Sequence, residues 1–267
     1  MDVTESDLLS LLKTLDTLKP YLEDIVIVGG WVPYIYRKYG AMPARHPSVR
    51  TGDIDIAVQH RVPDNGRMTI DDLLSKAGYT TRMYGSNSGA VKYELTTPPT
   101  EIEFITSEIG RSREESIAVQ SGLIAQALRY LDILLDNTRK ITINAQLSGL
   151  EIFATVKVPV PAAFVFQKAL TFPERRNKKA KDMYYIFDLL DSTSETQSQI
   201  PADIKAMKVK YPARWFRTTI NNLERYFPET GGEGPALVES QYVGPMNSDT
   251  FRNYARRIFR DMIERLQ

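Results

Sequence analysis

The sequence has no cysteine, only two histidines, and no long hydrophobic run that is free of charged residues. Without cysteine, the chain forms no disulfide bond, offers no thiolate to a zinc ion and has no cysteine nucleophile. His46 and His60 do not form a pair of the kind that Ser–His catalysis or a His-bound metal needs. The sequence therefore argues against the common nucleophilic hydrolases.

Targeting signals are also missing from the sequence. No segment approaches the length that spans a membrane without charges, and the first residues include Asp2, Glu5 and Asp7 where a signal peptide has a basic region. A chain without disulfides fits a reducing compartment. We therefore expect a cytoplasmic protein with no membrane partner.

The composition is that of an ordinary globular protein. Its 267 residues are 42% hydrophobic, which is enough for one large domain or two modest ones. The formal net charge is +1, and the residues after Leu150 carry a small excess of basic side chains. This asymmetry is compatible with a polyanionic substrate and equally with ordinary variation of a protein surface.

Hydrophobic periodicity predicts a mixed sheet followed by helices. Helices are expected over 5–18, 31–39, 69–77 and 122–135, and strands over 24–28, 53–58, 79–83, 90–96, 101–106, around Ile141 and over 152–158. After Pro159 we expect helices over 162–170, 174–190, 203–209 and 213–226 and a final helix capped by Ser248 or Asp249, with a linker over 192–199 and a loop over 229–247. The prediction is an α+β fold, with residues 1–158 as one domain and residues 159–267 as a helical C-terminal domain that completes a cleft.

Two aspartates in one strand are the most informative feature of the sequence. Alternation along a strand places Asp53 and Asp55 on one face, while Ile54 and Ile56 face a core. Aspartate is depleted in strands, and two carboxylates on one face repel each other without a cation. A solvated face of an edge strand is the alternative. Because Mg²⁺ prefers oxygen ligands and leaves positions for substrate phosphates, the pair predicts a metal–nucleotide site.

A glycine turn precedes this strand. Gly29 and Gly30 join a predicted buried strand to a predicted helix, where free backbone N–H groups and the helix dipole favour an anion such as a triphosphate. The alternative is a plain turn in which glycine supplies a positive φ. The turn lacks the Gly-Lys-Ser/Thr ending of a P-loop and the spacing of a dinucleotide fingerprint.

A third carboxylate and a basic run complete the candidates. Glu101 and Glu103 share one face of the predicted strand 101–106, and Glu103 lies deeper in it; the alternative is that both face solvent. Lys168 is followed by Arg175, Arg176, Lys178, Lys179 and Lys181 and then by Asp182, which suggests phosphate or nucleic-acid binding, or else a solvated helix face with a Lys178–Asp182 pair.

Taken in order, these residues resemble the DNA polymerase beta-like nucleotidyltransferase superfamily over residues 22–191. The resemblance is carried by Gly29-Gly30-Trp31, by Thr51-Gly52-Asp53-Ile54-Asp55, by Glu103, and by Lys168 with Lys181-Asp182. Within the superfamily the combination is similar to the AbiEii-type, toxin-related branch of stand-alone nucleotidyltransferases. Two positions depart from the family pattern, because Trp31 stands where a hydroxyl residue is expected and the third acid is Glu.

The resemblance implies a role for each of these residues. Gly29 and Gly30 would bind the incoming triphosphate, Asp53, Asp55 and Glu103 would be catalytic and hold Mg²⁺ or Mn²⁺, and Lys168, Lys181 and Asp182 would bind nucleotide. We expect two-metal-assisted attack of an acceptor hydroxyl on the α-phosphate of a nucleoside triphosphate, with Glu103 as a candidate proton acceptor. The candidate acceptor-binding residues are Arg175, Arg176, Lys178 and Lys179.

RNA, particularly the end of tRNA, is the acceptor that the resemblance favours, and a protein hydroxyl or a small molecule is the alternative. The branch also suggests a toxin with an antitoxin protein as partner. Two other functions remain open at this stage. One is an inactive protein on the same fold that binds nucleic acid or a partner; the other is a small-molecule nucleotidyltransferase, which would need an acidic pocket for a cationic acceptor.

Overall fold

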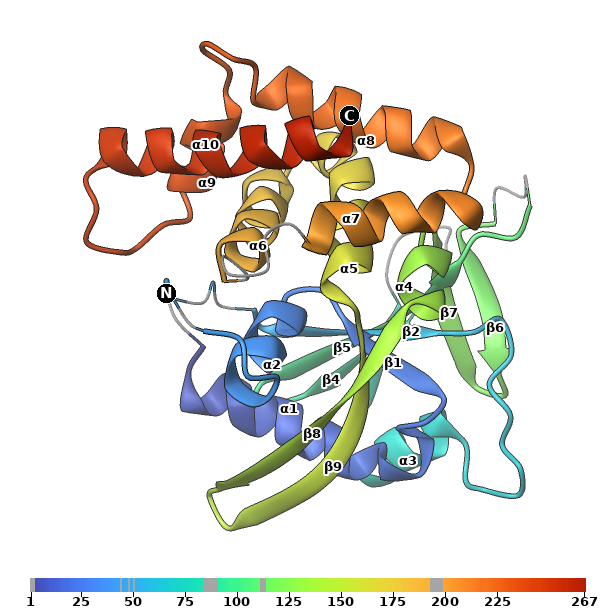
Figure 1. The fold of residues 1–267 in the computed structure, drawn as a ribbon. Helices are drawn as coiled ribbons and strands as arrows, with labels where there is room; N and C mark the ends of the chain where they lie inside the picture. The colour runs from blue at the N-terminus through green and yellow to red at the C-terminus, as the bar shows by residue number, and fades with distance from the viewer. Residues whose placement is uncertain are drawn as a thin grey trace. The chain divides into compact units, whose positions relative to one another are not determined.

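The computed structural model describes residues 3–43, 45–47, 49, 51–83, 91–110, 114–192 and 199–267. The chain divides into two compact units. The first comprises Asp2–Ala41 and Arg50–Val160, and the second comprises Met42–Val49 and Pro161–Gln267. The first unit is a mixed sheet flanked by helices and the second is built from helices, which confirms the predicted α+β fold (Figure 1).

The first unit contains a nine-stranded mixed sheet among the described residues. Its strands are β1 (Ile25–Val28), β2 (Asp53–Val58), β3 (Thr80–Met83), β4 (Val91–Leu95), β5 (Thr100–Ser107), β6 (Ser116–Gln120), β7 (Leu123–Leu128), β8 (Thr138–Leu147) and β9 (Leu150–Pro159). The main path runs β3-β4-β5-β2-β1-β9-β8, and β7 joins β6 to β5. β2 runs parallel to β5 and antiparallel to β1.

The strand β1 lies at the centre of the core. All four of its residues are buried and β-branched, as expected for a strand covered on both faces. Val26 and Val28 form a cluster with Ala57 of β2 and Ile105 of β5, beneath residues 131–134 at the start of the short helix α4 (Asp132–Asp136). The face of the sheet that α4 covers is therefore apolar at this point.

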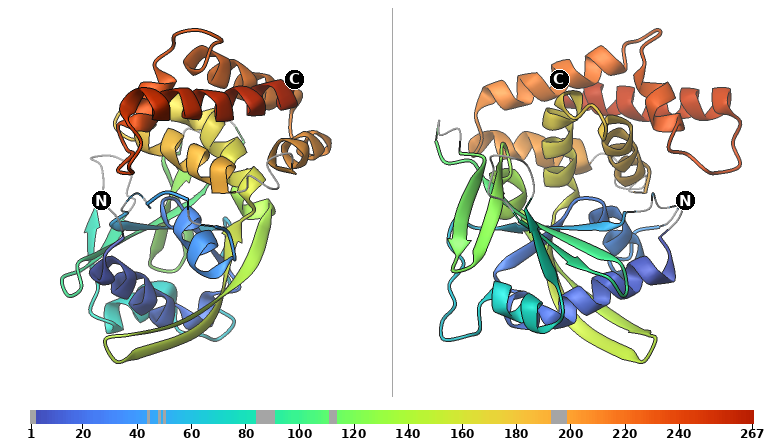
Figure 2. Two further views of the ribbon diagram at one scale, coloured as in Figure 1. Left: turned by 60° about the vertical axis from the view of Figure 1, so that its left-hand side comes forward. Right: turned by 180° about the vertical axis from the view of Figure 1, so that it is seen from behind.

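Three further helices belong to the first unit: α1 (Glu5–Thr17), α2 (Trp31–Tyr39) and α3 (Ile70–Lys76). A capping box starts α1, because the Thr4 hydroxyl accepts the Asp7 N–H at 3.2 Å while the Asp7 carboxylate accepts the Thr4 N–H at 2.9 Å. α1 lies along β8 and β9, and α2 contacts β1 and β8 (Figure 1). β8 and β9 form a long hairpin whose turn has positive φ at both Ser148 and Gly149 (Figure 2).

The predicted helix over 122–135 is wrong. Residues 123–128 form β7, with Leu123 and Ala125 fully buried and every second residue partly exposed, and only Asp132–Asp136 are helical. The strand β6, which pairs with β7, was not predicted. Leucine and alanine favour a helix locally, but pairing of β7 with both β5 and β6 outweighs that weak preference.

The second unit contains α5 (Pro161–Thr171), α6 (Lys179–Ser192), α7 (Gln199–Ala206), α8 (Ala213–Tyr226), α9 (Gly234–Glu239) and α10 (Ser248–Leu266). α6 begins at Lys179 and not at Glu174, because a short 3-10 turn at Phe172–Glu174 interrupts the helical chain. The predicted loop over 229–247 contains α9, and α10 is capped by Asn247. Most of the predicted linker over 192–199 lies outside the described residues. No helix in the described part of the chain is long and apolar enough to span a bilayer.

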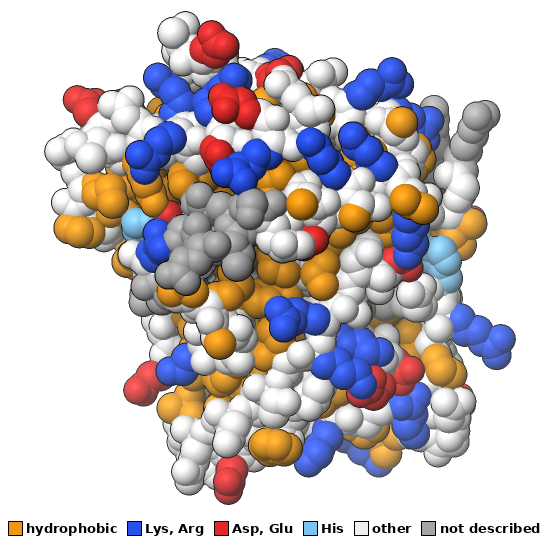
Figure 3. All heavy atoms as spheres, in the orientation of Figure 1, with side chains coloured by type: hydrophobic (Ala, Val, Ile, Leu, Met, Phe, Trp, Pro, Cys, Tyr) orange, Lys and Arg blue, Asp and Glu red, His pale blue; other side chains and the backbone are white. Residues whose placement is uncertain are grey.

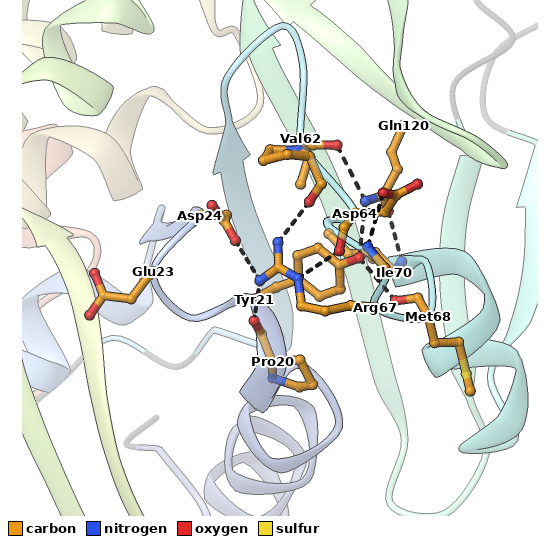
Figure 4. A network of polar contacts seen from close by, with 12 residues as sticks. Pro20, Tyr21, Glu23, Asp24, Val62, Asp64, Arg67, Met68, Ile70 and Gln120 are labelled. Atoms are coloured by element: carbon orange, nitrogen blue, oxygen red, sulfur yellow. Dashed lines mark hydrogen bonds and ion pairs between the residues drawn. The ribbon is translucent and has the colours of Figure 1, made fainter.

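A polar network fastens the segment that follows β2 to residues 20–24, which lie between α1 and β1 (Figure 4). The Arg67 guanidinium donates to the Asp24 carboxylate at 2.9 Å and to the carbonyl oxygens of Pro20 and Pro63 at 2.5 and 2.7 Å. It also lies 4.1 Å from the centre of the Tyr21 ring. One arginine therefore joins two separate stretches of chain, residues 20–24 and 63–67.

We expect the Arg67→Met variant to lower the free energy of unfolding by about 2 kcal/mol, because it removes several hydrogen bonds of a largely buried charged group. The control is Arg82→Met, whose side chain is 74% exposed and pairs with Glu94 at 3.4 Å; it should cost less than about 0.5 kcal/mol. Urea denaturation measures both values, and equal losses would contradict the role given to Arg67.

Candidate functional site

Asp53 and Asp55 lie on the same face of β2, the face that α4 covers further along the strand. The ladder pairs Asp55 with Val28 and Ala57 with Val26, so the carboxylates continue the row that begins with buried apolar side chains. Ile54 and Ile56 point to the opposite face and are fully buried. Both carboxylates are therefore carried by a rigid strand whose other face is anchored in the core.

The glycine turn lies directly against Asp55. Gly29 follows the last residue of β1 and has a φ of +66°. A Cβ atom at this position would lie 1.9 Å from Oδ2 of Asp55, so the carboxylate occupies the space that any side chain would take. Gly30 is the N-cap of α2 and provides no side-chain cap. The Asp55 carboxylate therefore lies against the residue that precedes the N-cap of α2, at the positive end of the helix dipole.

Trp31 and Thr51 hold Asp53 from two sides. The indole N–H of Trp31 donates to the Asp53 carbonyl oxygen at 3.1 Å, which joins the start of α2 to the start of β2. The Thr51 hydroxyl donates to Oδ1 of Asp53 at 3.0 Å, and Thr51 is 1% exposed. Trp31, which departs from the family pattern, is therefore a buried anchor, and Thr51 orients the carboxylate. The sequence analysis assigned neither role. The Thr51 hydroxyl, two residues before Asp53, was a signal for the second of them.

Glu101 and Glu103 lie on the neighbouring strand in register with the aspartates. In the parallel β2–β5 ladder Asp53 pairs with Glu101 and Asp55 with Glu103, which places the four carboxylates on one face. Lys92 of β4 pairs with Glu103 on the far side of β5. Its Nζ lies 2.5 Å from Oε1 of Glu101 and also forms an ion pair with Oε1 of Glu103.

Lys92 is the functional candidate that the sequence analysis missed. Burial lowers its pKa, but the hydrogen bonds to Glu101 and Glu103 outweigh this effect and raise the pKa above its ordinary value. The ammonium group is therefore charged at neutral pH. The alternation in Val91–Leu95 places Lys92 on one face of its strand, but only the register with β5 shows that this is the carboxylate face.

Part of this carboxylate face suits a divalent cation. Asp53 and Asp55 offer hard oxygen atoms on one face, which suits an ion of the Mg²⁺ or Mn²⁺ type that takes its other ligands from water and phosphate. The described residues contain no group of three or more His, Cys, Asp and Glu side chains that could together hold a metal ion. The two aspartates fit such an ion, whereas Glu103 is engaged by Lys92.

In the second unit, Lys168 and Asp182 form a buried ion pair. Nζ of Lys168 lies 2.6 Å from Oδ1 of Asp182, and their side chains are 7% and 3% exposed. Arg175 binds the second oxygen of the same carboxylate at 2.8 Å. Asp182 therefore accepts both cations, and its backbone N–H donates to the Lys178 carbonyl oxygen at 2.8 Å.

The basic run 175–181 does not form a single cationic face. Lys179 donates to the Tyr226 hydroxyl at 2.7 Å, and Lys181 lies 5.8 Å from the centre of the Tyr185 ring. Arg176 and Lys178 are exposed. Figure 3 shows further Lys and Arg side chains over the helices of this unit, with acidic side chains interspersed.

A histidine–aspartate pair also lies in the second unit. Nε2 of His46 is 3.0 Å from Oδ2 of Asp191, and the His46 ring stacks on Phe187 with centroids 5.5 Å apart. Burial raises the pKa of Asp191, but hydrogen bonds from His46 and Tyr254 outweigh it and hold the pKa below its ordinary value. The pair fastens the segment 42–49, which precedes Thr51 in the chain, to α6. The sequence analysis did not anticipate it.

A comparison with protein families gives one finding. A family model described as Nucleotidyltransferase matches residues 6–209, a range that contains every candidate residue named above. No curated protein and no solved structure matches the chain.

The Gly29→Ala variant tests the contact with Asp55. Alanine there faces both an unfavourable positive φ and the Asp55 carboxylate, and we expect a loss of about 3 kcal/mol in the free energy of unfolding. The control is Gly149→Ala, which has a φ of +79° and open space around its Cβ position; it should lose only about 1 kcal/mol. Urea denaturation measures the free energy of unfolding of both variants. Similar losses would show that the Asp55 carboxylate moves aside at little cost and would contradict the importance of this contact.

Lys168→Met tests whether the Lys168–Asp182 pair supports the helical unit. Removal of one partner leaves a buried charge with only the half-exposed Arg175, so we expect a loss of about 3 kcal/mol in the free energy of unfolding. Lys181→Met on the same helix as Asp182 is the control and should lose less than about 1 kcal/mol. Thermal and urea unfolding measure the stability of both variants. If Lys168→Met is as stable as wild type, the pair has no structural role.

Proposed function

The chain belongs to the nucleotidyltransferase family, and we propose that a divalent cation bound by Asp53 and Asp55 supports its transfer of a nucleoside monophosphate from a nucleoside triphosphate to an acceptor hydroxyl. The observation that carries the proposal is the contact between the Asp55 carboxylate and the Gly29 turn. It joins the candidate cation ligands to the start of a helix, where phosphate binding is favoured.

Several residues of the first unit have a role in this proposal. A bound Mg²⁺ or Mn²⁺ would neutralise phosphate charge and lower the pKa of an attacking hydroxyl. Thr51 orients the Asp53 carboxylate, and Trp31 holds α2 and β2 together, so that the ligands keep their positions without a cation. The backbone at Gly29 and Gly30 would approach the triphosphate closely, and Glu103 is the third carboxylate of the face.

For the second unit we propose roles in binding the substrates. Lys168 and Asp182 would hold Arg175 in place through the shared carboxylate, and Lys181 would contact nucleotide phosphates. Arg176 and Lys178 are exposed and suit the phosphates of an acceptor. Their charge favours a polyanionic acceptor over a cationic small molecule, and we propose RNA, specifically the end of tRNA. A toxin role with an antitoxin partner, as in the AbiEii-type branch, belongs to the same proposal.

The test uses the purified full chain with Mg²⁺ or Mn²⁺, each α-labelled nucleoside triphosphate in turn, and a total RNA fraction. We expect label in RNA, and we expect Asp53→Asn and Asp55→Asn to reduce the transfer rate by at least about a thousandfold, since the nucleotide loses its cation. The control is Asp16→Asn, an exposed position on α1 that should keep the wild-type rate.

The alternatives give different results in the same experiment. Label in a protein or in a small molecule would replace the RNA acceptor but keep the reaction. Binding of triphosphate or RNA without transfer to any acceptor would favour an inactive binding protein. Equal rates for wild type and both Asn variants would remove Asp53 and Asp55 from the mechanism.

A further inference from the structure

Lys92 lies two strands away from the aspartates of the candidate cation site, and it contacts Glu103 on the strand between them. In the order β4-β5-β2, Glu103 stands between Lys92 on one side and Asp55 on the other. The Glu103 carboxylate can therefore either form an ion pair with Lys92 or share a cation with Asp55. In the structure it is paired with the lysine.

The surroundings of Lys92 are those of a fixed cation. The Lys92 side chain is 14% exposed and that of Glu103 is 18% exposed, so water screens this pair much less than an ordinary surface ion pair. Glu101 binds the same ammonium group from the adjacent register position. Two carboxylates thus hold Lys92, and a shift away from one of them would leave the ammonium bound to the other.

The charge on this face divides into two halves. Asp53 and Asp55 on β2 form one half. Glu101 and Glu103 on β5, with Lys92 and the exposed Arg82–Glu94 pair beyond them, form the other. Strands in a sheet lie about 4.8 Å apart, so carboxylates in register repel one another unless cations lie among them. Lys92 already supplies one positive charge to the glutamate half. The aspartate half has the ligands that suit a divalent ion.

We propose that Lys92 takes the place of a second metal ion in this face: it holds Glu103 away from the aspartates, so that Asp53 and Asp55 bind a single divalent cation and Glu103 is not a ligand. The inference rests on the proposed function, because it concerns the same cation site. Lys92 is then a positioning residue that acts through Glu103. It agrees with the described residues, which contain no three-carboxylate group placed to hold a metal ion.

The experiment measures metal binding rather than turnover. Mn²⁺ is titrated into the full chain, alone and with a non-hydrolysable nucleoside triphosphate analogue, and free Mn²⁺ is followed by electron paramagnetic resonance. Wild type should bind one Mn²⁺ in both conditions. Glu103→Gln should keep the Mn²⁺ affinity within about twofold, whereas loss of a true ligand would weaken it by about tenfold or more.

Lys92 variants supply the second arm. Lys92→Met removes the ammonium and frees Glu103, so we expect a second bound Mn²⁺ or an increase of about tenfold in Mn²⁺ affinity. Lys92→Arg keeps the charge and should bind one Mn²⁺, as wild type does. Arg129→Met, which removes a 64% exposed cation that lies 3.6 Å from Glu108, should change nothing and serves as the control. Circular dichroism confirms that each variant is folded.

The outcomes separate this inference from the proposed function. Wild-type Mn²⁺ affinity in Asp53→Asn and Asp55→Asn would remove the cation site itself. Loss of binding in those two variants, together with two Mn²⁺ ions in wild type or a tenfold loss in Glu103→Gln, would overturn the role of Lys92 while the proposed function stands. If Lys92→Met binds Mn²⁺ as wild type does, Lys92 does not control Glu103 and the inference fails.

Discussion

The Asp55 carboxylate fills the space that a side chain at residue 29 would need, and the arrangement of the candidate site depends on this contact. Gly29 makes it possible both by lacking a Cβ atom and by adopting the positive φ that turns the chain from β1 into α2. Because Val28 is the ladder partner of Asp55, the register, the turn and the start of the helix are fixed together. A phosphate and a carboxylate repel each other in such a corner. A cation held by Asp55 would offset this repulsion, which supports the proposed metal-assisted phosphate chemistry.

One face of the sheet changes from apolar to acidic along its strands. Beneath α4 it carries Val26, Val28 and Ala57, and beyond them it carries carboxylates of β2 and β5. The same strands therefore carry both the apolar side chains of the core and the candidate cation ligands, so that packing of the core holds the ligands in place. Like charges on neighbouring strands cost free energy, and Lys92 offsets part of that cost in the half formed by β5. The half formed by β2 is where the proposed divalent ion would contribute most.

Local pattern predicted those parts of the chain in which local and tertiary preferences agree. The helices 31–39 and 213–226 have the predicted bounds, and alternation correctly placed Asp53 with Asp55 and Glu101 with Glu103 on shared faces. The prediction failed at 122–135, where pairing with two strands decides the structure, and at α9, a short helix among glycine and proline residues. The ion pair between Glu103 and Lys92 could not be predicted from the sequence either. Alternation gives the face of a strand, but the neighbour across it depends on a register that the sequence does not state.

The basic run 175–181 shows why the sign of a charge cluster is a poor guide to its role. Lys168 and Arg175 both bind the buried carboxylate of Asp182, and Lys179 binds Tyr226, so much of the run is engaged within the second unit. A buried ion pair adds little stability compared with an apolar pair of similar size, because desolvation offsets the attraction. What the pair supplies is geometry: Asp182 lies in the first turn of α6 and fixes α5 and Arg175 to it. The exposed Arg176 and Lys178 lie in the turn that Arg175 fastens to Asp182, and such a fastened turn would suit the proposed contact with acceptor phosphates.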